Sequence, residues 1–342
     1  MGTDRTARHQ LRVEDVGWAE TFEARPPGPP LRDLFGEGEA KRTAMRHHVA
    51  HRLEGYAKLG LSPVFRRLPM RWVSDLTGPV LAPGVARRYR PTGRWARMDR
   101  LIARMRPDMG DREARERFQE RWYVNIGRAM GEFLIADRLV AAGCAQVHGM
   151  EHQRAAVASE RPVIVVTVHT AAWEVTGMVS LCEHFANRGV SSWQPQANRF
   201  ENRLVARARQ RCGYKVLAPR PRLAARLRQV LNTPGQMLFL LVDEQSENQN
   251  KFPLFGRPAP SRCNLSFALR LAAGTGALIL PLTTWRTADA LRYAMAYHPP
   301  LDVSALPAAD RLAAGAEALN AVFEPHVVRH LDEWYMLHSI KL

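Results

Sequence analysis

The chain has 342 residues, and its apolar and charged fractions are those of an ordinary globular protein rather than of a disordered or fibrous one. Its formal net charge of +16 predicts a polyanionic partner and leaves open nucleic acid, anionic lipid headgroups, phosphorylated metabolites and an acidic carrier protein. The four cysteines have no CxxC or Cys/His ligand spacing, so free thiols in a reducing compartment are expected.

Residues 1–40 are polar and contain a Pro/Gly-rich stretch at 25–30, which predicts a flexible N-terminal tail. The first residues have no apolar core, so no signal peptide is expected. No run approaches the roughly eighteen consecutive apolar residues of a membrane span. Residues 41–341 are predicted to form a single domain, with a helical part at 41–145 and an α/β catalytic part at 146–341.

Large apolar residues and arginines are mixed in the segment 41–81, which Pro63 and Pro69 are expected to divide into short helices. Such a segment suits a helix at a membrane interface, with apolar side chains at the acyl boundary and arginines at the phosphates. A helical hairpin packed on the core explains the same pattern. The arginine cluster at 87–106 fits either a nucleic-acid or a membrane surface, but no nucleic-acid-binding motif accompanies it.

Apolar residues recur at three- and four-residue spacing over 111–142, which predicts a structural helix. After residue 145, short apolar strands alternate with helices. This order predicts an α/β fold, with a mostly parallel central sheet flanked by helices. The expected strands lie near 162–168, 237–242, 277–281 and 292–297, and the expected helices near 171–187, 201–212, 264–274 and 308–331.

His169 directly follows the apolar run 162–168, and a helix is expected to begin at once, with Thr170 as a candidate N-cap. Ligands bind at this edge of open α/β sheets. Glu174 lies in the first turns of that helix, from which it can face back toward the imidazole. A carboxylate on one ring nitrogen makes the other a better general base. A structural histidine and a glutamate that serves the helix dipole explain the same residues.

Asp243 and Glu244 follow a second expected strand, 237–242. If the two strands are parallel neighbours, these carboxylates meet His169 at one rim of the sheet. Capping of the next turn, or ion pairs with arginines such as Arg257, is the structural alternative. The sequence leaves open which carboxylate orients His169. There is no GxSxG elbow, so a serine hydrolase is not expected.

Five signatures occur in a recognisable order along residues 55–341. They are Gly149–His152, the HxxxxE motif His169–Glu174, Val242–Gln245 with Phe252–Ala259, Leu271–Pro281 and Glu333–His338. In these signatures the chain resembles the bacterial lipid A late acyltransferases (lauroyl and myristoyl acyltransferases) and the lysophospholipid acyltransferases, including the phosphatidylinositol mannoside acyltransferases.

The resemblance implies transfer of a fatty acyl chain from acyl carrier protein or coenzyme A to a lipid hydroxyl, with no metal or cofactor and no nucleic-acid partner. It implies that His169 is the general base, that Glu174 orients it, and that Asp243 and Glu244 support the site. Together with the positive charge and the lack of a predicted span, the resemblance predicts work on an anionic membrane surface, as a peripheral protein on the cytoplasmic face of the cytoplasmic membrane.

The chain departs from the family at 193–195, which reads Trp-Gln-Pro where relatives often carry Tyr-Arg-Pro. Arg199 and Arg209 are the candidates to replace that arginine, and Trp173 and Arg257 complete the expected substrate contacts. The family's usual N-terminal membrane span is not found, which favours peripheral attachment. Two other functions remain open: a non-catalytic binder of anionic membranes or nucleic acid, and an acyl thioesterase or other hydrolase on the same scaffold.

Overall fold

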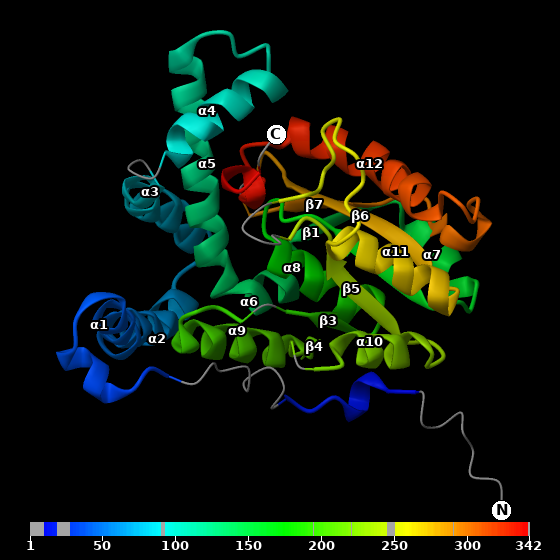
Figure 1. Ribbon diagram of the computed structural model, residues 1–342, viewed down its shortest axis with the longest axis horizontal. Helices are drawn as coiled ribbons and strands as arrows, with labels where there is room; N and C mark the ends of the chain where they lie inside the picture. The colour runs from blue at the N-terminus through cyan, green and yellow to red at the C-terminus, as the bar shows by residue number, and fades with distance from the viewer. Residues whose placement is uncertain are drawn as a thin grey trace, which may run out of the picture.

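The computed structural model describes residues 10–18, 28–89, 93–193, 195–219, 221–244, 250–289 and 291–340. At its centre is a sheet (Figure 1) whose strands are β1 Ala145–His148, β2 Val163–Thr167, β3 Gly189–Ser192, β4 Lys215–Leu217, β5 Met237–Leu241, β6 Leu278–Arg286, β7 Tyr293–Tyr297 and β8 Leu301–Asp302. The strand order is β1-β7-β6-β2-β5-β3-β4, with β8 paired to β6. Only the pairs β6–β7 and β6–β8 are antiparallel. The predicted α/β class with a mostly parallel central sheet is confirmed.

Helices flank this sheet, and the helices between residues 38 and 133 form a separate group to one side of it, at the left in Figure 1. Their bounds are α1 Gly38–Met45, α2 His51–Arg67, α3 Met70–Tyr89, α4 Arg94–Met105, α5 Arg112–Phe133, α6 Ala136–Ala141, α7 Met150–Ala158, α8 Trp173–Met178, α9 Arg199–Cys212, α10 Leu223–Leu231, α11 Asn264–Thr275 and α12 Arg311–Arg329. Pro69 separates α2 from α3 as predicted, whereas Pro63 lies inside α2. The helix predicted at 111–142 is two helices, α5 and α6, because the chain turns between them.

The sheet is buried on both faces, as expected for parallel strands. Alternate side chains point to opposite faces, so that Ile164 and Val166 of β2 pack into one hydrophobic core and Val163 and Val165 into the other. Helices α10, α11 and α12 contribute to the first core. Helices α6, α7, α8 and α9 contribute to the second. This arrangement holds the carboxyl ends of β2 and β5 at a fixed edge, where the candidate site lies.

The N-terminal residues 10–18 pack against the α/β part. Val13 and Val16 are buried, the backbone N–H of Leu11 donates to Thr233 Oγ1 at 2.9 Å, and that of Val13 donates to the side chain of Gln236 at 2.9 Å. The prediction of a flexible tail over 1–40 is therefore wrong for residues 10–18, because two small apolar side chains and paired backbone groups are enough to hold them. Residues 1–9 and 19–27 of that predicted tail lie outside the described residues.

Among the described residues, no helix is both long and apolar enough to cross a membrane.

Candidate active site

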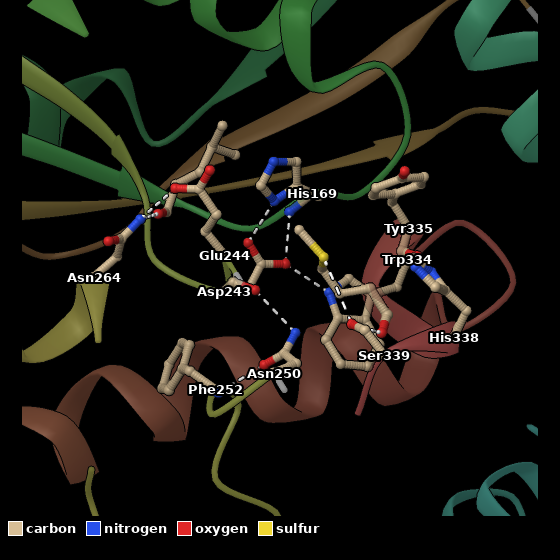
Figure 2. A network of polar contacts seen from close by, with 12 residues as sticks. His169, Asp243, Glu244, Asn250, Phe252, Asn264, Trp334, Tyr335, His338 and Ser339 are labelled. Carbon is tan, nitrogen blue, oxygen red and sulfur yellow. Dashed lines mark hydrogen bonds and ion pairs between the residues drawn. The ribbon is translucent and has the colours of Figure 1, made fainter. Parts of the chain in front are cut away.

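Two neighbouring strands bring the predicted histidine and aspartate together. In the parallel pair β2–β5, Thr167 lies beside Leu241. His169 and Asp243 each follow two residues later, so they leave the same edge of the sheet side by side (Figure 2). The register of β2 and β5 therefore brings the two strand ends together at one rim of the sheet, as predicted.

Asp243 binds His169 through both carboxylate oxygens. Oδ1 lies 2.7 Å from His169 Nδ1, and Oδ2 accepts the backbone N–H of His169 at 2.9 Å. An ionised carboxylate can only accept, so Nδ1 carries the proton and Nε2 is the basic nitrogen when the ring is neutral. Among the described residues, Nε2 has no hydrogen-bond partner. An imidazole nitrogen in this arrangement can accept a proton from a ligand.

The electrostatics of the pair favour a basic imidazole. Burial by itself lowers the pKa of His169, since the ring is only 8% exposed, but the charge and hydrogen bond of Asp243 outweigh burial and raise the pKa above its ordinary value. Glu244 and Glu174 add smaller contributions in the same direction. His169 is therefore a stronger base than a free histidine.

Two further side chains hold Asp243, which is fully buried. The indole N–H of Trp334 donates to Oδ2 at 2.7 Å, and the amide of Asn250 donates to the Asp243 carbonyl at 2.9 Å (Figure 2). The backbone N–H of Tyr335 donates to the His169 carbonyl at 2.8 Å. The C-terminal turn thus fixes both members of the pair. Trp334 and Tyr335 belong to the signature Glu333–His338, but no role is predicted from the sequence for them or for Asn250. The further signal for Trp334 is that a buried indole needs a hydrogen-bond acceptor.

We expect Trp334→Phe to lower kcat about tenfold with little change in KM, because a hydrogen bond to a charged carboxylate is worth about 1.5–3 kcal/mol and its loss frees Asp243 to turn. Steady-state kinetics of the folded variant measure this. Trp95→Phe removes an indole elsewhere in the same core and serves as the control. An unchanged kcat in folded Trp334→Phe would show that Trp334 does not position the pair.

His169 opens onto a cavity of about 120 Å³. This volume can hold only a small part of a ligand and does not enclose a long alkyl chain. The cavity is lined by His169, Trp173, Glu174, Ser191, Ser192, Trp193, Gln196, Val205, Arg209, Tyr214, Phe239, Leu241 and Glu244.

Glu174 does not hold His169, which corrects the role given to it from the HxxxxE motif. Its carboxylate pairs with Arg209 of α9, with Arg209 Nε 3.1 Å from Oε2. The physical reason is the turn after His169: Ala171 has a left-handed φ of 50°, and α8 begins only at Trp173. The N-cap prediction for Thr170 is also wrong, since its hydroxyl donates to the Thr284 carbonyl.

Of the other predicted site residues, two line the cavity and one supports a neighbouring loop. Trp173 lines the cavity, with its ring 5.5 Å from that of His169, and Glu244 lines it while accepting from Asn264 at 2.7 Å. Arg257 instead donates to the carbonyls of its own loop, including that of Asn250, so it supports the loop that holds Asp243.

The two arginines predicted to contact substrate, Arg199 and Arg209, differ in position relative to the cavity. Arg199 is outside the cavity lining and donates to the His47 carbonyl at 3.1 Å, so the predicted substrate contact is not supported for it. Arg209 lines the cavity, and its Nη1 is buried without a hydrogen-bond partner. The indole N–H of Trp193, in the same lining, is likewise unpaired. Buried donors of this kind are normally satisfied, so both are suited to an oxygen-bearing ligand.

The described residues contain no group of three or more His, Cys, Asp or Glu side chains that could hold a metal ion.

Comparison with known proteins identifies the family of this chain. Residues 42–340 match the family model described as bacterial lipid A biosynthesis acyltransferase. Among solved structures, the chain is similar to the 1-acyl-sn-glycerophosphate (LPA) acyltransferase PlsC from Thermotoga maritima, with 15% identity and a TM-score of 0.35 over 74% of this chain and 97% of that chain. Comparison with curated proteins finds no match. Because the family model covers most of the chain, this protein belongs to the bacterial lipid A biosynthesis acyltransferase family.

Proposed function

We propose that this acyltransferase moves a fatty acyl chain from a thioester of acyl carrier protein or coenzyme A to a hydroxyl of a lipid acceptor, with His169 as the general base. The observation that carries the proposal is the His169–Asp243 pair at the cavity, with Nδ1 bound at 2.7 Å and Nε2 left without a partner among the described residues. Asp243, rather than Glu174, orients the base.

The reaction needs one proton acceptor and one proton donor, and the same nitrogen serves as both. Nε2 of His169 takes the proton of the acceptor hydroxyl as its oxygen attacks the thioester carbonyl carbon. When the carbon–sulfur bond breaks, the leaving thiolate takes that proton back from Nε2. Asp243 stays ionised and stabilises the imidazolium between the two steps.

The cavity lining supports substrate positioning. Trp173, Trp193 and Phe239 offer apolar walls to the first carbons of an acyl chain. The unpaired donors of Arg209 and Trp193 suit an oxygen atom of the substrate. The backbone N–H groups of Ala171 and Ala172 have no acceptor among the described residues and are our candidates for stabilising the oxyanion.

Attachment to a membrane surface is supported by helices α2 and α3. Leu53, Tyr56 and Val64 of α2 are 68%, 62% and 53% exposed, and Trp72 and Val80 of α3 are 58% and 69% exposed. Large apolar side chains gathered on one part of a basic protein are typical of an interfacial binding surface. We infer that the protein works at the surface of the cytoplasmic membrane, on its cytoplasmic face, through these two helices.

We expect Leu53→Glu combined with Val64→Glu to weaken binding to lipid vesicles about tenfold or more, because each change replaces apolar area that membrane binding would bury with a charge. Vesicle flotation measures this. The matched control is Val157→Glu with Leu312→Glu, two exposed apolar positions on α7 and α12. Equal binding by both double variants would place the membrane contact elsewhere.

Incubation with an acyl thioester, with and without a lipid acceptor, tests the reaction class. Transfer predicts a new lipid ester and a thiol release that depends on the acceptor. Equal release of free fatty acid in both samples would indicate a hydrolase. Strong vesicle binding without any turnover of the thioester would indicate a non-catalytic binding protein.

A further inference from the structure

A second hollow lies away from His169, between α2 and α9. Its volume is about 470 Å³, several times that of the cavity at His169. Four arginines line it, Arg66 and Arg67 from α2 and Arg207 and Arg211 from α9. No residue of this lining is shared with the His169 cavity.

The hollow carries a net positive charge. Asp137 of α6 pairs with both Arg66, at 2.6 Å, and Arg211, at 2.9 Å. One carboxylate therefore balances two of the four guanidinium groups. Arg67 and Arg207 are exposed and have no acidic partner among the described residues. Two guanidinium groups that line one hollow from different helices, and that have no acidic partner among the described residues, favour a bound anion, and arginine pairs suit phosphate oxygens in particular.

The same hollow has an apolar side. Leu59, Pro63 and Leu204 line it beside the arginines, and Leu204 is only 8% exposed. Helix α2 also carries the exposed Leu61 and Val64, 50% and 53% exposed, next along its surface. A ligand with a phosphate and an adjoining apolar part can satisfy both kinds of lining at once.

Helix α9 stands between this hollow and the His169 cavity. Leu204 and Arg207 face the hollow, whereas Val205 and Arg209 line the cavity. Contact between α2 and α9 is close, since a Cβ on Gly55 would lie 2.3 Å from the ring of Phe200, and Lys58 pairs with Glu201. An anion held by Arg67 and Arg207 would add a further link between the helix that carries exposed apolar residues and the helix that holds Glu174.

We propose that the hollow between α2 and α9 binds the phosphate of an anionic phospholipid headgroup, with Arg67 and Arg207 as its principal donors. A lipid is favoured over an acidic protein because the arginines are combined with apolar lining and with exposed apolar residues on the same helix. The site is separate from the reacting groups, and the proposal goes beyond the acyl transfer proposed above.

Binding of monomeric dihexanoylphosphatidylglycerol, measured by isothermal titration calorimetry, tests the site. We expect Arg67→Gln combined with Arg207→Gln to weaken binding about ten- to thirtyfold, as expected for two arginines at an anionic lipid. Arg154→Gln combined with Arg228→Gln makes the same charge change on exposed positions of α7 and α10 and should leave binding unchanged. Equal loss in the two double variants, or no loss in either, would overturn the proposal.

Binding measurements with other anionic ligands distinguish a lipid site from a site for free phosphate or for an acidic protein. Inorganic phosphate and glycerol 3-phosphate should bind more weakly than the lipid, and equal affinity would show a site for free phosphate instead. Loss of acyl carrier protein binding in the Arg67/Arg207 variant, with lipid binding retained, would show a protein-docking site. His169→Ala should bind the lipid as the unchanged protein does, so the result does not depend on the reaction proposed for His169.

Discussion

Asp243→Asn should lower kcat about 10³-fold while the protein stays folded. The asparagine amide can donate to His169 Nδ1, which would place the proton on Nε2 and remove the base from the substrate side. The variant also loses the charge that stabilises the imidazolium. Steady-state kinetics, with the thermal unfolding temperature as the measure of folding, test this expectation.

The pH dependence of activity should also differ between the unchanged protein and Asp243→Asn. A general base works in its neutral form, so the activity of the unchanged protein should rise with pH through an apparent pKa above the ordinary histidine value of about 6.5. Without the Asp243 charge, burial is the main remaining influence, and burial lowers the pKa of His169. The rising limb of the residual activity should therefore move to lower pH.

The variant Glu174→Gln tests which of the two carboxylates, Asp243 or Glu174, orients His169. Because Glu174 pairs with Arg209 and not with His169, its substitution should cause a smaller loss of kcat and leave the rising limb near its original pH. If Glu174→Gln gave the larger loss and the larger shift, the assignment of Asp243 as the orienting carboxylate would be wrong.

His169→Ala should reduce acyl transfer about 10³-fold or more, because general acid–base catalysis contributes about 10²–10⁴-fold and the substitution also leaves a cavity beside the substrate. In the variant, the backbone N–H of residue 169 and the indole N–H of Trp334 can still donate to the buried Asp243 carboxylate, so the variant should fold. His152→Ala, on the half-exposed face of α7, is the matched control for loss of an imidazole. Near-normal transfer by folded His169→Ala would contradict a role for this residue in the chemistry.

The position of the site could be predicted because it depends on strand ends. His169 follows a continuous β-branched run, and Asp243 follows a second apolar run, so adjacency of two parallel strands is enough to bring them together. The short strands β3 and β4 were missed, since they have no long apolar run. Their place in the sheet depends on neighbours rather than on their own residues.

The partners of each carboxylate could not be predicted. The expected turn from strand to helix at His169 allowed Glu174 to face back toward the imidazole. Instead, the left-handed Ala171 and the later start of α8 leave Glu174 paired with Arg209, 35 residues further on. Trp334 lies 91 residues from Asp243. Contacts between residues so far apart in the sequence depend on how the helices and the C-terminal turn pack against the sheet. A local sequence pattern cannot predict them. The resemblance to lipid A acyltransferases, in contrast, is confirmed by the family match over residues 42–340.

Mass spectrometry of lipids tests the central claim most directly, using cells that carry either the unchanged gene or the His169→Ala gene at equal protein levels. The account predicts a lipid that bears one additional ester-linked acyl chain in the first cells, and its unacylated precursor in the second. Identical lipid profiles in the two cell types would contradict acyl transfer by His169.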